Sequence, residues 1–140
     1  MPKAFALIEG DSADSDRVII VRGEIDVGNT AALRDWLVRA SAGGRRSVTV
    51  DLSGVRFLAI SGLYVLCEEQ HRMAAHRSRL TVVCDDPRAL QLIAVCRLED
   101  TLHVVPSRSR GAARTPWSAD DDARADRLAA WLERYTAQSA

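Results

Sequence analysis

The feature that most constrains the fold of this chain is the spacing of its apolar residues. Along most of the sequence, segments with the spacing of a β-strand alternate with segments with the spacing of an α-helix. Residues 47–53 (SVTVDLS) alternate between apolar and polar side chains, which is the period of a half-buried β-strand. A helix with one buried stripe has apolar residues at positions i, i+3, i+4 and i+7. This spacing occurs at Leu33, Trp36, Leu37 and Ala40. The full pattern predicts the order ββαβαβαβ with short connections. Because strand–helix–strand units need parallel strands with helices on the sheet faces, we expect an α/β fold: one mixed sheet of four or five strands with packed helices.

Cap and turn residues mark the ends of the expected elements. Gly54 is expected to end the third strand, and Asn29 or Thr30 to begin the first helix. Asp86 should begin the third helix, with Pro87 in its first position. The strands are predicted at residues 3–9, 17–22, 47–53, 79–84 and 101–105.

Charge and composition exclude several classes of function. The chain has 140 residues, enough for one domain, with 19 Lys+Arg and 19 Asp+Glu, so its formal net charge is zero. No bulk charge would recruit nucleic acid or an anionic membrane. The N-terminus lacks the pattern of a secretion signal, and no apolar run approaches the ~20 residues of a membrane span. We therefore expect a cytoplasmic protein that binds neither nucleic acid nor membrane.

No pattern of residues indicates catalysis, a cofactor or a metal. Cys67, Cys84 and Cys96 are widely spaced, have apolar neighbours and form no CxxC pair, so they are interpreted as small core residues. A glycine-rich phosphate loop and a nucleophile elbow are both missing. Glu24 and Asp26 are close in sequence, but two carboxylates in a turn are more typical of turn chemistry than of an acid/base pair. The chain is predicted not to be an enzyme.

The composition changes after the last predicted strand. Residues 107–117 are rich in arginine and contain no acidic or large aliphatic side chain, which favours a linker. Residues 118–137 then follow a helical period, in which Leu128, Trp131 and Leu132 belong to an apolar stripe. This amphipathic helix needs a partner for its apolar face. It would either fold back on its own domain or associate with another chain, including a second copy.

The stretch FLAISGLYVL, Phe57–Leu66, begins as an apolar strand and continues as a helix. Ser61 at the joint is expected to cap the helix N-terminus, and Gly62 to permit a close backbone approach. The same strand-to-helix joint could be an exposed protein-docking surface. A phosphate there would lie at the positive end of the helix dipole and would change the charge of any interface built on it.

Three segments resemble a known family. VRGEIDVGNTAALRDWL, VTVDLSGVRFLAISGLYVL and LTVVCDDPRALQLIAVCRLEDTLHVV are similar to the STAS domain of anti-sigma factor antagonists, from about Phe5 to Val105. The resemblance implies a STAS-like single domain at residues 3–106. It also implies a partner, an anti-sigma factor of the histidine-kinase-like ATPase type that is a serine kinase, whose capture frees a sigma factor for transcription. In regulated members of the family, that partner phosphorylates a serine on the STAS domain.

The joint departs from the regulated family pattern, Asp-Ser-Ser/Thr-Gly, in which the first hydroxyl accepts the phosphate. Aligned on Gly62, the aspartate position is Ala59 and the acceptor position is Ile60, neither of which can serve. Ser61 falls on the second hydroxyl. Tyr64 stands where the family usually has a glycine, so the docking face is bulkier. The usual phosphate switch is therefore expected to be absent.

Three hypotheses remain open for this surface. The preferred one is constitutive or differently regulated partner binding. The second is a phosphorylation switch that uses Ser61, and the third is a scaffold subunit in a larger sensory complex. The predicted partner-binding residues are Glu24, Asp26, Val27, Ala59, Ile60, Ser61, Gly62, Leu63 and Tyr64.

Overall fold

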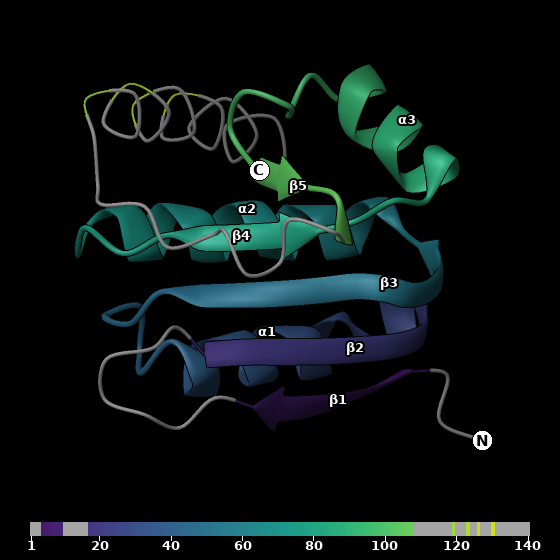
Figure 1. Cartoon of the computed structure of the whole chain (residues 1–140), viewed down its shortest axis with the longest axis horizontal. Coiled ribbons are helices and arrows are strands. Elements are labelled where there is room, and N and C mark those ends of the chain that lie inside the picture. Colours follow the sequence, from purple (N-terminus) through teal and green to yellow (C-terminus); the bar gives the residue numbers. More distant parts are fainter. Residues whose placement is uncertain are drawn as a thin grey trace.

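A computed structural model describes residues 4–9 and 17–107, together with single residues 119, 123, 126 and 130. The strands form one five-stranded sheet in the order β1-β2-β3-β4-β5 (Figure 1). The elements are β1 (Ala4–Glu9), β2 (Arg17–Ile25), the 3₁₀ helix η1 (Val27–Asn29), α1 (Thr30–Ala40), β3 (Val48–Leu58), α2 (Ile60–Ala74), β4 (Leu80–Val83), α3 (Pro87–Val95) and β5 (His103–Val105).

The sheet is mixed, as the order of apolar periods predicts. β1 is antiparallel to β2, and β2 to β5 run parallel to one another. Helices α1 and α2 lie side by side on one face of the sheet, and α3 lies near β4 and β5 (Figure 1). The predicted α/β class and element order are confirmed, with η1 as an additional short element.

β3 is longer than predicted because it contains two bulges. Between the pairs Ile20–Asp51 and Arg22–Gly54, β3 holds one extra residue, and Arg56 is a second one without a partner in β2. A Cβ at Gly54 would lie 2.9 Å from Cγ of the exposed Arg22, so a larger residue at this bulge would require the Arg22 side chain to move. The prediction that Gly54 ends the strand is wrong, because β3 continues through it to Leu58.

The core lies between the sheet and the helices that cover it, where side chains such as Leu37 of α1 and Leu66 of α2 are fully buried. Cys67 and Cys84 are buried free thiols, which confirms their interpretation as small core residues, and Cys96 is half-buried. Burial raises the pKa of Cys84 and raises that of Cys67 to about 12. These thiols are therefore held in their neutral form.

Most of the sequence beyond residue 107 lies outside the described residues, including the predicted linker and the apolar stripe of the last helix. Ala119, Ala123, Asp126 and Ala130 are helical and exposed, and their spacing is that of one helix face. Whether the predicted apolar stripe of residues 118–137 packs on its own domain or on another chain stays a prediction. In the part of the chain that the structure describes, no helix is both long enough and apolar enough to cross a membrane.

Candidate docking site

Three connections meet at the carboxyl edge of the parallel strands. β2 leads there into η1 and α1, β3 into α2, and β4 into α3, and in Figure 1 this edge lies on the right, where α2 and α3 begin. Loops that follow parallel strands gather at one edge of a sheet, which is where such folds place their binding sites. We call residues 24–29 and 57–64 the docking corner, because they form the first two of these connections.

The first half of the docking corner is fixed by a network of local hydrogen bonds. The Asp26 carboxylate accepts a hydrogen bond from the Gly28 amide at 2.9 Å and so caps η1. The Asn29 side chain accepts from the Asp26 amide at 2.9 Å and donates to the Glu24 carbonyl at 2.8 Å. Asn29 is the N-cap residue of α1, which begins at Thr30 as expected, but its side chain makes no capping hydrogen bond to α1 and stabilises the preceding turn instead. Val27 is left 78% exposed at the tip.

The second half of the docking corner is joined directly to the first. The Ala59 amide donates to the Ile25 carbonyl at 2.8 Å, just where β3 passes into α2. A Cβ at Gly62 would lie 2.7 Å from Cγ2 of Ile25 and 3.0 Å from Cδ1 of Leu58. Glycine therefore allows the first turn of α2 to pack against the end of β2, as predicted. The two halves are therefore joined into one continuous surface.

Ser61 is not the cap of α2. The capping position is Ala59, which has an extended backbone and makes no side-chain hydrogen bond, and Ile60 is the first helical residue. Ser61 is the second, and its Oγ is buried without a hydrogen-bond partner. The serine therefore lacks the N-cap role predicted from the sequence, and its hydroxyl does not face solvent.

The predicted partner-binding residues differ in their exposure. Val27 is the most exposed, followed by Ile60 with 45% of its surface accessible. Gly62 and Leu63 are buried in this structure, and their assignment to partner binding stays a prediction. The remaining predicted residues are half-buried: Glu24, Asp26, Ala59, Ser61 and Tyr64.

Phe57 is an exposed residue of the docking corner that the sequence interpretation did not select. It is 54% exposed, although it belongs to an apolar run that resembles a buried strand. The bulge at Arg56 shifts the alternation of the strand, so that Arg56 and Phe57 are both exposed between the buried Val55 and Leu58. No local sequence signal could have found it, because Val55 and Phe57 keep a two-residue period and the bulge is visible only in the pairing of β3 with β2.

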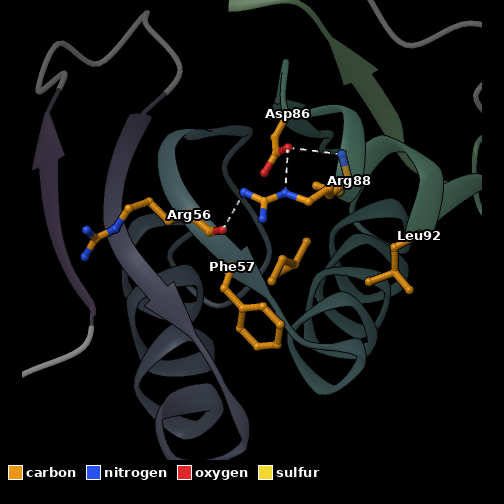
Figure 2. A pocket seen from close by; sticks show the side chains of 7 residues that line it. Arg56, Phe57, Asp86, Arg88 and Leu92 are labelled. Atoms are coloured by element: carbon orange, nitrogen blue, oxygen red, sulfur yellow. Dashed lines mark hydrogen bonds and ion pairs between the residues drawn. The ribbon is translucent and has the colours of Figure 1, made fainter.

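A groove adjoins the docking corner between the end of β3 and the start of α3 (Figure 2). Its volume is about 310 Å³, and it is lined by Arg56, Phe57, Leu58, Asp86, Arg88, Ala89 and Leu92. Asp86 caps α3 by accepting from the Arg88 amide at 3.0 Å, and Pro87 follows it, as predicted. The groove itself was missed, because it is formed by residues about thirty positions apart in the sequence.

One carboxylate on α2 is buried away from the docking corner. Glu69 is fully buried, and neither of its carboxylate oxygens has a hydrogen-bond partner. Arg72 lies 3.6 Å from Oε1. Burial raises the pKa of Glu69, and the opposing effect of Arg72 and Arg34 is smaller. Within residues 4–9 and 17–107, no three His, Cys, Asp or Glu side chains are grouped so that they could hold a metal ion.

Comparison with known proteins agrees with the resemblance and extends it. A curated relative, the anti-sigma-F factor antagonist RsfA of Mycobacterium tuberculosis, is 28% identical over 104 residues, which cover 73% of this chain and 81% of the relative. The crystal structure of an anti-sigma factor antagonist from Mycobacterium paratuberculosis is similar with a TM-score of 0.69 and 26% identity, covering 80% of this chain and 95% of that one.

More distant structures share the fold. The anti-sigma factor antagonist SpoIIAA in its unphosphorylated form has a TM-score of 0.62 at 15% identity, with 79% of this chain and 99% of that chain covered. The sequence model described as "Mlab, STAS domain" matches residues 8–106, which include β2 to β5, all three α-helices and both halves of the docking corner. The chain therefore belongs to the STAS domain family.

Proposed function

We propose that this chain is a non-enzymatic binding module that acts as an anti-sigma factor antagonist. It binds an anti-sigma factor of the ATPase and serine kinase type through the docking corner, and thereby controls sigma-dependent transcription. The names of its relatives support the class of partner. The observation that carries the proposal is the pair of exposed apolar side chains, Val27 and Ile60, held on one continuous surface at the carboxyl edge of the sheet.

Exposed apolar side chains at a fixed surface favour protein binding over catalysis. A fully buried aliphatic side chain contributes about 1.5–3 kcal/mol relative to an exposed one, and Val27 and Ile60 have much of that contribution still to gain. Phe57 extends the same surface, and aromatic residues are enriched in protein interfaces. The hydrogen-bonded backbone network beneath them lowers the entropy that binding must overcome.

We further propose that phosphorylation does not switch this docking corner off. Ile60 occupies the first position of α2, where a hydroxyl would have to stand, and it has none. The adjacent Ser61 has a hydroxyl, but its Oγ is buried. Regulation by the amount of either protein, or by another modification, remains compatible with this surface.

A binding experiment tests the proposal. The full chain is used to capture purified ATPase-type anti-sigma factors encoded in the same genome, and the affinity is measured by calorimetry. Ile60→Asp is expected to weaken binding by at least about tenfold, since it removes an apolar contact and adds a charge that must be desolvated. Val95→Asp is the matched control, because Val95 is 71% exposed on α3, outside the docking corner. If no anti-sigma factor binds, or if both variants bind equally, the proposal fails.

The alternative with a phosphorylation switch is separated by intact-mass measurement after incubation with the captured anti-sigma factor and ATP. The wild-type mass is expected to stay unchanged, while the double variant Ala59→Asp/Ile60→Ser, which restores the family pattern, gains one phosphoryl group. Phosphate on wild-type Ser61 would support the switch instead. A scaffold role would be marked by stable co-purification with other STAS chains rather than with an ATPase.

A further inference from the structure

The groove beside the docking corner has the shape of a site for a side chain of a protein. Its volume of about 310 Å³ is at the lower limit of ligand pockets, which span about 300–1,000 Å³. Leu58 lines it near the core, while Phe57 and Leu92 lie on opposite sides and Arg88 extends across one end (Figure 2). The lining is therefore mostly apolar, with the Arg88 guanidinium and the Asp86 carboxylate side by side at one end.

The Arg88 guanidinium group makes two contacts within the protein, and these do not use all of its N–H donors. Its Nη2 donates to the Arg56 carbonyl at 3.4 Å, and its Nε lies 3.7 Å from the Asp86 carboxylate, while its side chain stays 82% exposed. A guanidinium group has five N–H donors in a planar fork that matches a carboxylate. Both contacts are long, so most of this donor capacity faces solvent. The Arg56 side chain extends away from Arg88 and from the groove, so Arg56 contributes its backbone carbonyl to this end of the groove (Figure 2).

The groove is continuous with the docking corner. Leu58 lines the groove and also lies below α2, where a Cβ at Gly62 would be 3.0 Å from its Cδ1. Phe57 belongs to the docking corner and lines the groove as well. A protein that covers Ile60 and Phe57 must therefore also pass over the groove. The apolar walls, the Arg88 guanidinium and the neighbouring Asp86 carboxylate determine which side chains of that protein fit there.

We infer that the groove binds an apolar side chain flanked by a carboxylate, supplied by the same protein that binds the docking corner. The apolar side chain lies between Phe57 and Leu92, and the carboxylate pairs with the Arg88 guanidinium. The inference rests on the proposed function for the identity of that protein. It adds a specificity requirement, an acidic and apolar segment, that the docking corner alone does not impose.

The groove is tested first without the partner. The ¹⁵N-labelled full chain is titrated at millimolar concentration with the blocked peptide Gly-Leu-Asp-Glu-Gly, and separately with Gly-Leu-Lys-Lys-Gly. The acidic peptide is expected to shift the amide signals of Phe57, Ala89 and Leu92, and the basic peptide is not. In Arg88→Glu, this preference should reverse. That variant places an acid in the first turn of α3, where the helix dipole favours it, so the fold should be kept.

The inference is overturned if neither peptide shifts these signals, if both peptides shift them equally, or if the preference is unchanged in Arg88→Glu. Shifts of the same signals that depend on protein dilution alone would assign the groove to a second copy of this chain, and would overturn it too.

A second arm separates this inference from the proposed function. An anti-sigma factor that binds the wild type should bind Arg88→Glu about tenfold more weakly. If Ile60→Asp loses binding while Arg88→Glu binds like the wild type, the groove inference fails and the proposed function stands. If no anti-sigma factor binds, the proposed function fails, and the peptide titration still decides whether the groove selects acidic apolar segments.

Discussion

Gly62→Ala should destabilise the fold at the docking corner. The added methyl group would lie 2.7 Å from Cγ2 of Ile25 and 3.0 Å from Cδ1 of Leu58, whereas carbon atoms pack best at about 3.5–4.0 Å. Overpacking of this kind costs about 1–3 kcal/mol, and replacing a helical glycine by alanine returns up to about 1 kcal/mol. The expected balance is a loss of about 1–2 kcal/mol, because Ile25 is buried and cannot move freely.

Urea unfolding followed by circular dichroism measures this loss, and calorimetry with the captured anti-sigma factor measures its effect on binding. Ser61→Ala is the matched control at the neighbouring position. It also gains helix propensity but adds no atom, and it removes a buried hydroxyl that has no partner, so its stability should equal or exceed that of the wild type. The reasoning is refuted if Gly62→Ala is as stable as Ser61→Ala.

Three further predictions concern other parts of the structure. Glu69→Gln should raise stability at neutral pH, because it removes a buried negative charge whose desolvation outweighs the attraction of Arg72 and Arg34. Since the folded-state pKa of Glu69 is raised, wild-type stability is full below the ordinary glutamate pKa of about 4.3 and is lost as pH rises through the raised value. Urea unfolding at a series of pH values should therefore show the gap between the two proteins closing in acid, and a constant gap would contradict this. Asn29→Ala should cost about 1–2 kcal/mol in the same assay, because two hydrogen bonds of the turn are lost; an unchanged midpoint would exclude the role given to this side chain. Cys67, with a pKa of about 12, should resist iodoacetamide in the native protein and react after unfolding, as mass spectrometry of its peptide would reveal; rapid native labelling would refute its burial.

The fold could be predicted because each α-helix and strand has a local signal, whereas the short η1 was not predicted. The strict alternation in residues 47–53 and the stripe that includes Leu33 and Leu37 specify their elements without reference to distant residues. The start of α3 was also predictable, since Asp86 and Pro87 act through the backbone of their own turn. These predictions depend only on periods and caps, which a single sequence contains.

The docking corner was predicted only in part, because its geometry depends on contacts between strands. The N-cap prediction for Ser61 follows residue preference. In the structure the Ala59 amide donates to the Ile25 carbonyl at the end of β3, and α2 begins two residues earlier, with Ala59 as its N-cap. The exposure of Phe57 depends on the register of β3 against β2, which no local pattern reports. The groove needs the spatial neighbourhood of β3 and α3, which the sequence order alone does not give.

The bulge at Arg56 has a consequence for the evolution of this surface. Since this residue has no partner in β2, its carbonyl is available to Arg88 on another element, and the next side chain, Phe57, faces solvent. Loss of the Arg56 codon would restore regular pairing at this point and remove the carbonyl that accepts from Arg88, while Phe57 would keep its partner Glu24 and its place between the buried Val55 and Leu58. Homologous chains should therefore be compared by the number of residues between Asp51 and Gly62, because a change in length there would mark a change of recognition even where the amino acids look conserved.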